Sequence, residues 1–517
     1  MIRRTVYIII ISFSTFFGIS CSTNNQPNIV FFLVDDLGWR DVGVYGSSFY
    51  DTPNIDQLAK EGIRFTQAYT ASHVCSPTRA SILTGKYPAR LKLTDWLKGR
   101  PEYDFEKLRS AKFFQHLPFE ETTLAEELKI RGYNTAIFGK WHLGENPSGP
   151  LEHGFDVQLP KWNKGWPNKG YYSPFGLDGL EDSKGDYLTD RLTDEALKYI
   201  EENKDQPFFL YLSHFAVHDP IHGRPDLVEK YNNKLAKTSQ PIDGQFILEG
   251  NPDGLDPLSG NDLEKLIKKT SHKGYKVLPQ RTVKIKQYQD NIHFAAMIES
   301  MDESLGRVMS KLKDLDIEKN TIVIFFSDNG GMSAANFYNP NKVISSSEVD
   351  EYYSTSNLPL RGGKGWLYEG GIRVPMIVKW PGELQKGGVS DELVMSTDFY
   401  PTILEMAGFS LKPDQHMDGK SFIKALKGES YDREAIYWHF PHYSNHGMQS
   451  PGGAIRLGDY KLLEYFENNT IQLFNLVDDP KEQKDLSIIM PEKAAELHKM
   501  LEDWRKNVSA NMMQDKE

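Results

Sequence analysis

Four oxygen-bearing side chains follow two apolar runs of the sequence and could together hold a metal ion. Asp35 and Asp36 follow the run IVFFLV, and Asp328 and Asn329 follow the run IVIFF after one serine. Carboxylate and amide oxygens are hard ligands, which suit Ca²⁺ or Mg²⁺ better than zinc. Three converging carboxylates would repel one another unless a cation compensated them. The alternative is that these are two unrelated acidic turns.

Five cationic or titratable side chains could form a second group that binds an anion. Two of them, Lys140 and His142, are two residues apart, so an extended backbone directs both to the same side. Each of the five could also be an ordinary surface charge. Beside a divalent ion, however, they would form a pocket for a tetrahedral anion. The set is Arg79, Lys140, His142, His218 and Lys364.

The stretch SHVCSPTRASILTG contains Cys75, and the chain of 517 residues has only one other cysteine, Cys21. Pro77 fits the first turn of a helix, which places Cys75 at the helix N-terminus. Free backbone N–H groups and partial positive charge at that end attract anions. A nucleophile there could attack an anionic group, with Arg79 one turn further along. The alternative is a buried, inert cysteine.

The elements that must position these residues alternate between apolar strands and amphipathic helices. Strand-like runs lead to the polar clusters named above, and the clearest helical pattern covers residues 293–315. This alternation predicts an α/β fold with a large, mostly parallel sheet flanked by helices on both faces. Ligands gather at the carboxyl ends of the strands in such sheets. After residue 426 the pattern changes to short strands and a final helix.

The first 21 residues resemble an export signal. Two arginines precede an apolar run at 6–17, which is too short for a membrane span, and GISC resembles a bacterial lipobox. We expect an exported protein, in the bacterial periplasm or an outer-membrane lipoprotein, that meets the membrane only through a lipid anchor on Cys21. A plain signal peptide with an incidental cysteine is the alternative. The net charge of −11 argues against a nucleic-acid partner.

These motifs resemble the type I, formylglycine-dependent sulfatases of the alkaline phosphatase-like superfamily. CSPTR at 75–79 resembles the family signature C-x-P-x-R, and GYNTAIFGKWHLG at 132–144 resembles the second signature. The similarity also includes DDLGWRDVGVYG, SDNGG, LRGGKGWLYEGGIRVP and STDFYPTILEMAG. It implies a sulfatase catalytic domain over 26–426 and a smaller C-terminal subdomain over 427–517, with an antiparallel sheet and a helix.

The resemblance also implies the cofactors. A maturation enzyme would oxidise Cys75 to formylglycine, whose hydrate is the nucleophile of the family. One Ca²⁺ per chain would be bound at the same place. The implied metal ligands are Asp35, Asp36, Cys75 after oxidation, Asp328 and Asn329.

The remaining roles are likewise carried over from the family pattern. His218 would protonate the leaving group, and His142 would deprotonate the hydrate so that sulfate is expelled. Arg79 and Lys140 would stabilise the oxyanion of residue 75, and Lys364 would hold the sulfate. The residues predicted to contact the substrate are His214, Lys364, His439 and His442.

The predicted function is hydrolysis of sulfate esters, with an O-sulfated carbohydrate as the substrate. The carbohydrate is favoured because residues 161–187 form an insertion rich in Gly, Trp and Tyr, and aromatic loops beside a cleft stack on sugar rings. A phosphodiester or phosphonate monoester hydrolase of the same superfamily is the alternative. A non-catalytic glycan-binding lipoprotein is the alternative of another class.

Overall fold

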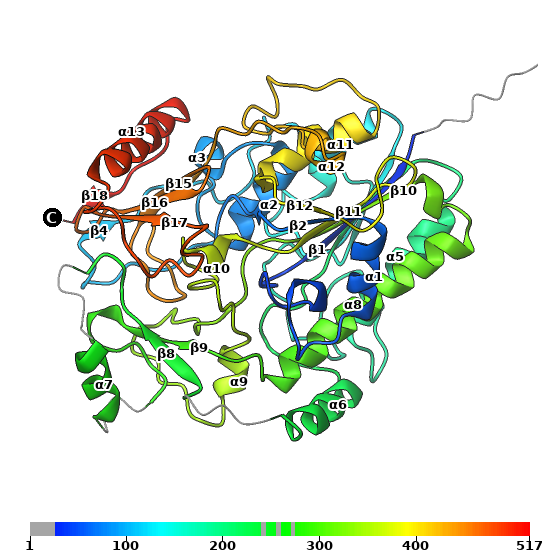
Figure 1. Cartoon of the computed structure of the whole chain (residues 1–517). Coiled ribbons are helices and arrows are strands. Elements are labelled where there is room, and N and C mark those ends of the chain that lie inside the picture. The colour runs from blue at the N-terminus through cyan, green and yellow to red at the C-terminus, as the bar shows by residue number, and fades with distance from the viewer. Residues whose placement is uncertain (1–25, 239–243, 255–259, 270–273, 517) are drawn as a thin grey trace, which may run out of the picture.

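The main sheet of the protein is mostly parallel, as predicted. The computed structural model describes residues 26–238, 244–254, 260–269 and 274–516. Within them, eight strands form one sheet in the order β12-β2-β11-β10-β1-β7-β5-β6, and β11 runs antiparallel to both of its neighbours. Figure 1 labels β1, β2, β10, β11 and β12 of this sheet. The strands are β1 (Asn28–Val34), β2 (Ile63–Phe65), β5 (Asn134–Gly139), β6 (Val157–Leu159), β7 (Phe208–Ser213), β10 (Thr321–Ser327), β11 (Met376–Lys379) and β12 (Gly388–Ser390).

Helices cover both faces of this sheet, which explains why β1 is apolar from Ile29 to Val34. Phe32 packs into the core on one face, and Phe31 packs into the core on the other. The first core contains residues of α1 (Pro53–Glu61), α5 (Leu188–Glu202), α6 (Pro225–Leu235) and α8 (Ile292–Asp314). The second contains residues of α2 (Cys75–Thr84), α4 (Leu124–Lys129), α11 (Phe399–Met406) and α12 (Ile423–Leu426).

The register brings the carboxyl ends of the central strands to one edge of the sheet. Val34 of β1 lies opposite Ser327 of β10, and Ser213 of β7 lies opposite both Leu33 and Gly139. The strands therefore end within one residue of each other. The polar residues that follow them, at positions 35, 140, 214 and 328, are brought to the same edge.

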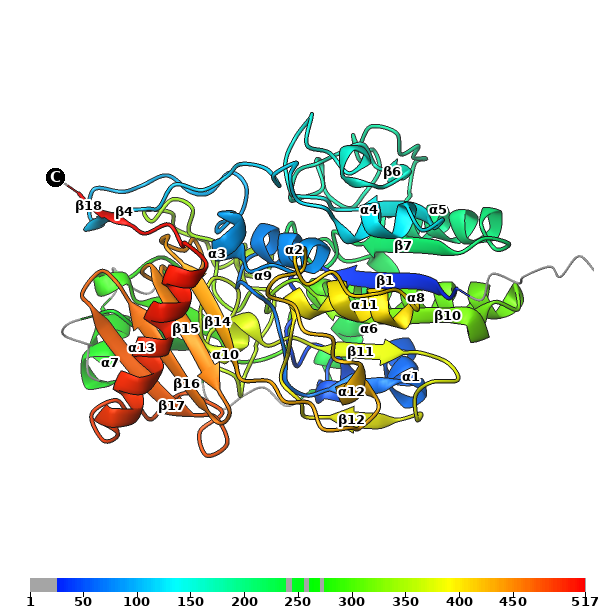
Figure 2. The ribbon, with the colours of Figure 1, turned by 90° about the horizontal axis from the view of Figure 1, so that it is seen from above.

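A smaller antiparallel sheet follows in the chain and lies beside the main sheet, with α13 packed against it (Figure 2). After α13, the last segment of the chain returns to an earlier one, because β18 (Gln514–Asp515) pairs with β4 (Leu108–Arg109). The sheet and helix comprise β14 (Ala435–Phe440), β15 (Gly452–Leu457), β16 (Tyr460–Tyr465), β17 (Thr470–Asn475) and α13 (Pro491–Asn507). The division into a catalytic domain that ends at residue 426 and a subdomain that begins at residue 427 remains a prediction.

The other elements are short and lie in the connections between these layers. They are β3 (Ala68–Tyr69), α3 (Pro88–Leu91), β8 (Phe246–Glu249), α7 (Gly260–Lys268), β9 (Val283–Lys286), α9 (Val349–Tyr352), α10 (Glu369–Ile372) and β13 (Val394–Met395). The predicted signal at 1–21, with Cys21, lies outside the described residues. In the described part of the chain, no helix is long and apolar enough to cross a membrane.

Candidate active site

Carboxylates from two strands meet Cys75 at the carboxyl edge of the sheet. One ligand atom from each of Asp35, Cys75 and Asp328 lies within 4.8 Å of the other two, and all three residues are buried. The backbone turns sharply at Asp36, whose φ is 61° and whose N–H donates to Asp328 Oδ1 at 3.2 Å. Asn329 joins the cluster through a 2.8 Å hydrogen bond from its Nδ2 to Asp36 Oδ1. The predicted ligand set therefore converges.

Two oxygens of this cluster have unused acceptor capacity that fits a cation. Asp35 Oδ1 and Asn329 Oδ1 are buried and, among the described residues, make no hydrogen bond. Buried polar atoms are normally satisfied, so orphaned oxygens beside other carboxylates point to a positive ligand. Burial and the neighbouring Asp328 carboxylate raise the pKa of Asp35 well above its usual range. The donor set fits Ca²⁺, because all four side chains from 35, 36, 328 and 329 offer hard oxygen.

Three cationic side chains form ion pairs with the carboxylates, and Arg79 contacts two of them, Asp328 and, at 3.8 Å, Asp35. Lys140 Nζ lies 2.6 Å from Asp35 Oδ2, and Lys364 Nζ lies 2.7 Å from Asp36 Oδ2. Arg79 Nε donates to Asp328 Oδ2 at 2.9 Å. Lys140 and Arg79 are almost completely buried, and buried charges require such pairing. Lys364 also lines the cleft described below, whereas Arg79 and Lys140 do not.

Helix α2 begins at Cys75, as predicted, and all ten of its residues are buried. The Thr78 hydroxyl donates to Ser72 O at 3.0 Å, which holds the preceding loop against the first turn of the helix. The Ser76 hydroxyl accepts a hydrogen bond of 3.2 Å from the Leu97 N–H. The side chain of Cys75 is a free thiol that lines the cleft. Its position at the helix N-terminus favours negative charge there.

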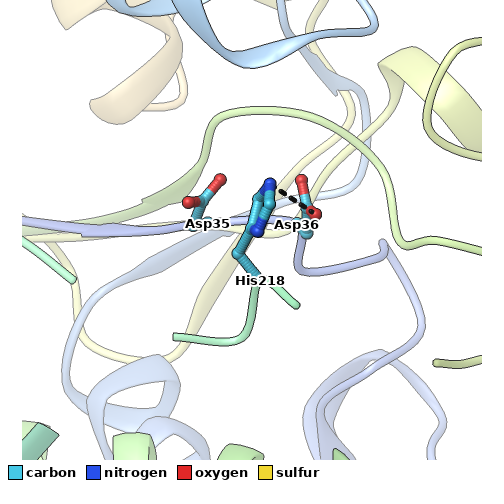
Figure 3. Close-up of side chains that lie close together, drawn as sticks. All are labelled: Asp35, Asp36 and His218. Atoms are coloured by element: carbon cyan, nitrogen blue, oxygen red, sulfur yellow. Dashed lines mark ion pairs between the residues drawn. The ribbon is translucent and has the colours of Figure 1, made fainter. Parts of the chain in front are cut away.

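His218 lies above the acidic cluster and carries a positive charge. Its Nδ1 is 2.6 Å from Asp219 Oδ1, and its Nε2 is 3.8 Å from Asp36 Oδ2 (Figure 3). Burial and Lys364 oppose the charge, but Asp36, Asp219 and Asp35 outweigh them and raise the pKa of His218 to about 9. The side chain also lines the cleft, so it can donate a proton to a group bound there.

His142 lies in the cleft wall as a neutral imidazole. Burial and the nearby Lys140 hold its pKa well below the usual range. Nε2 donates to Leu97 O at 2.8 Å, and Nδ1 is buried with no hydrogen-bond partner in the described structure. A Cβ on Gly165 would lie only 2.3–2.6 Å from three atoms of the ring, so glycine is required there. The ring is clamped in one orientation with Nδ1 free to accept a proton.

Three predicted substrate contacts are not in the cleft. His214 is fully buried and its Nε2 lies 3.0 Å from Ser304 Oγ, because the end of β7 turns it into the core. His439 Nε2 lies 2.8 Å from Asn511 O, and His442 Nε2 lies 2.8 Å from Thr94 Oγ1. His439 lies in strand β14 of the smaller sheet and His442 follows that strand, and both are buried against aromatic side chains. Their positions do not support direct contact with a substrate.

The cleft has a volume of about 920 Å³, and its walls come from loops that lie far apart in the sequence. Cys75, His142, His218 and Lys364 line it together. Sequence reasoning missed most of its wall, since no periodicity or motif marks loop residues that face a ligand. Trp166 and Tyr172 belong to the aromatic segment 161–187 that the sequence indicated, whereas the missed residues include Trp96, Lys98, His222, His293, Tyr338, Tyr352, Asn445 and His446.

The chain matches known proteins along most of its length. The family model described as Sulfatase matches residues 27–409, and the one described as N-sulphoglucosamine sulphohydrolase, C-terminal, matches residues 363–510. A sulfatase of Formosa agariphila is 30% identical over 540 residues, covering 90% of this chain and 85% of that protein. The N-acetylgalactosamine-6-sulfatase of Mus musculus is 32% identical over 456 residues, covering 84% of this chain and 71% of that protein.

One solved structure has a similar fold over nearly the whole chain. It is the crystal structure of Ps i-CgsB in complex with k-i-k-neocarrahexaose, with 27% sequence identity and a TM-score of 0.68. The match covers 93% of both chains. The similarity therefore includes the smaller antiparallel sheet as well as the main one.

Proposed function

The chain belongs to the sulfatase family and is a sulfuric ester hydrolase, and we propose that it removes O-sulfate from a carbohydrate. In this proposal Cys75 is matured to formylglycine and one Ca²⁺ is bound beside it. The observation that carries the proposal is the convergence of Asp35, Asp328 and Cys75 within 4.8 Å. Cys75 of that cluster lines a cleft together with Lys364 and His218, so one tetrahedral anion can contact these three residues.

The cation would be held by Asp35, Asp36, Asp328 and Asn329, together with residue 75. When bound, Ca²⁺ supplies positive charge that stabilises negative oxygen on the sulfate and on the nucleophile. The formylglycine side chain, once hydrated, supplies an oxygen nucleophile. Lys364, which lines the cleft, binds a sulfate oxygen. Arg79 and Lys140, which do not line the cleft, add positive charge to the site.

Two histidines move protons in this reaction. His218 is oriented by its 2.6 Å contact with Asp219 and donates its Nε2 proton to the sugar oxygen that leaves. His142 is neutral, and its Nε2–H is occupied by Leu97 O, which leaves Nδ1 as the acceptor. It takes the proton from residue 75 in the step that releases sulfate. Release of sulfate would break the C–O bond at residue 75 and leave its aldehyde, and addition of one water would restore the hydrate, so that the complete cycle would hydrolyse the sulfate ester.

A carbohydrate substrate is supported by the composition of the cleft. Trp96, Trp166, Tyr172 and Tyr338 line it, and aromatic side chains offer flat apolar faces to sugar rings. The names of two similar proteins point the same way, since one acts on N-acetylgalactosamine 6-sulfate and the other was solved with k-i-k-neocarrahexaose. An enzyme that matures Cys75 is the second partner. Export as a bacterial lipoprotein rests on residues 1–21 alone.

The same charges could hold phosphate, so the test compares the two esters directly. Matured enzyme with added calcium is assayed on matched aryl sulfate and aryl phosphate esters, and on a series of sulfated mono- and oligosaccharides. The proposal predicts faster release of sulfate than of phosphate, and faster turnover of a sulfated sugar than of the aryl ester. A large preference for the phosphate ester would overturn it in favour of a phosphoester hydrolase.

A further inference from the structure

A second cavity lies beside the cleft and shares part of its wall. This side cavity has a volume of about 360 Å³ and shares Lys98, His142 and Trp166 with the cleft. Its remaining polar wall comes from Gln115, Glu145, Asn163 and Lys164. Because the shared residues include His142, the side cavity lies next to the residues proposed to act on the sulfate.

The charges of the side cavity differ from those at the base of the cleft. Lys140, Lys364 and Arg79 are each paired with a carboxylate. In the described part of the chain, Lys98 and Lys164 have no carboxylate within ion-pair distance, although Lys164 Nζ lies 5.0 Å from the centre of the Trp162 ring. Among the residues that line the cavity, Glu145 is the one acid. Two unpaired ammonium groups therefore face a single carboxylate.

An oriented amide adds a hydrogen-bond donor to these lysines. Asn163 Oδ1 accepts a 2.7 Å hydrogen bond from Gln158 Nε2, so the amide is fixed with Nδ2 as its free donor. The backbone holds Asn163 in place as well, because its carbonyl oxygen accepts a 3.1 Å hydrogen bond from the His142 N–H. Fixed donors next to unpaired ammonium groups are the arrangement that binds an anion.

Trp166 connects the two cavities. Its side chain is 41% exposed and lines both of them, so a sugar ring stacked on it would have substituents in each. We propose that the side cavity binds a second anionic substituent, a sulfate or a carboxylate, on the sugar next to the one that loses its sulfate. This inference rests on the proposed function and narrows its substrate to polyanionic glycans.

Kinetic discrimination between three disaccharides tests the side cavity. Each carries N-acetylgalactosamine 6-sulfate, and the neighbouring sugar is neutral galactose, sulfated galactose or glucuronic acid. We expect a higher kcat/KM for the two anionic disaccharides than for the neutral one. The selectivity ratio is kcat/KM for an anionic disaccharide divided by kcat/KM for the neutral one. The variant Lys164→Ala should lower this ratio about fivefold, and the double variant Lys98→Ala with Lys164→Ala about twentyfold, because each solvent-accessible ion pair contributes up to about 1 kcal/mol.

The control is Lys161→Ala, which removes a lysine of the same loop that lines neither cavity. Its ratio should equal that of the unchanged enzyme. Added salt should also reduce the preference, since accessible charges are screened. An unchanged selectivity ratio in the double variant, or an equal fall in the control variant, would overturn the proposal that the side cavity binds an anion. The sulfated and glucuronic acid arms show separately which anion is preferred.

A binding measurement keeps this test independent of turnover. The sulfated-galactose disaccharide is titrated into Cys75→Ala and into Cys75→Ala with Lys164→Ala, each with calcium present. We expect the second variant to bind about fivefold more weakly. Equal affinity of the two variants, or no detectable binding to either, contradicts the proposed anion site in the side cavity, whatever the activity of the enzyme. If binding weakens as expected but enzyme in which Cys75 has been matured to formylglycine releases no sulfate from any disaccharide, the proposed function fails and the anion site stands.

Discussion

The base of the cleft and its rim are built in opposite ways. At the base, residues that directly follow buried strands form ion pairs with almost no exposure to solvent, such as Lys140 with Asp35. At the rim, loop residues such as Lys98 and Trp166 are partly exposed and, within the described structure, Lys98 has no ionic partner. Catalysis requires fixed geometry, whereas selectivity among glycans requires accessible contacts. On the proposed function, the base carries out the reaction and the rim selects the substrate.

This difference predicts a ranking of effects. Removing one member of a buried, paired network leaves an uncompensated charge or an empty catalytic position, so changes at the base should be severe. Changes at the rim remove solvated contacts and should act mainly on substrate affinity. A rim variant that abolished turnover would contradict this ranking.

The largest effect is expected at the base, from Cys75→Ala. Removing a nucleophile that acts as one unit with its neighbours should lower kcat by a factor on the order of 10⁴ or more. Sulfate release from a sulfated oligosaccharide measures it, and equilibrium binding of the same compound should persist because the rim is unchanged. Residual turnover close to that of the original enzyme would contradict the mechanism.

Removal of the metal should come next. Without a cation, Asp35, Asp36 and Asp328 repel one another, so a chelator should lower activity by a factor on the order of 10³ and also lower the melting temperature. Ca²⁺ should restore both, and at 100 times its dissociation constant it should add about 2.7 kcal/mol of stability. Full activity after exhaustive chelation, checked by elemental analysis, would exclude a metal in the reaction.

Gly165→Ala tests the contact between rim and base. Its Cβ would meet the His142 ring at 2.3–2.6 Å, so the ring must move. We expect kcat to fall about 10²-fold with KM nearly unchanged, because small misplacements of a catalytic group have effects of that size. The matched control is Gly250→Ala, where the nearest atom would be 3.8 Å away. Equal kcat in both variants would show that His142 is not positioned by this loop.

Sequence reasoning predicted the base much better than the rim. Asp35 and Asp328 follow apolar runs that are recognisable as buried strands, and parallel pairing places strand ends together. Pro77 fits the first turn of a helix, and this likewise placed Cys75 at the start of α2. Residues such as Lys98 and Gly165 carry no comparable signal, because loop conformation depends on contacts that are distant in sequence.

The histidine predictions show the same limit. His214 follows a strand as Lys140 does, yet its ring is buried against Phe32 instead of facing the cleft. His439 and His442 lie in and just after a strand of the smaller sheet, where residue type alone does not distinguish a substrate contact from a packed aromatic ring. His446, four residues after His442, does line the cleft, and nothing in its sequence neighbourhood separates the two.

At the rim, Trp166→Ala should raise KM about 3- to 10-fold for an oligosaccharide and leave kcat within a factor of two, because one aromatic contact contributes roughly 0.5–1.5 kcal/mol. Steady-state kinetics separates the two constants. Phe114→Ala is the control, since Phe114 is 48% exposed and lines no part of the cleft. A fall in kcat as large as that of Gly165→Ala would mean that the rim also positions the base.

The smallest effect is expected far from the cleft, at the ion pair between His498 and Glu464 on α13 and β16. Their atoms Nε2 and Oε1 are 2.9 Å apart, and the hydrogen bond that His498 donates to Glu464 raises the pKa of His498 despite partial burial. This stabilisation is complete below the unfolded pKa of histidine, near 6.5, and is lost as pH rises through the higher folded value.

His498→Gln should therefore lower stability by less than about 1 kcal/mol at pH 5.5, with the pair being partly solvated, and by almost nothing at pH 9. Melting temperatures at both pH values measure the difference. Equal destabilisation at the two pH values would show that packing, rather than charge, is what His498 contributes. Activity should not change, which separates this region from the cleft.

The most direct test of the account is the mass of the peptide that contains Cys75, measured on the same preparations used for activity. Oxidation of the thiol to the aldehyde exchanges sulfur for oxygen and removes two hydrogens, so the modified peptide is lighter. The account predicts that sulfate release rises in proportion to the aldehyde fraction across preparations with different maturation. Equal activity in a preparation that contains only the thiol would contradict it.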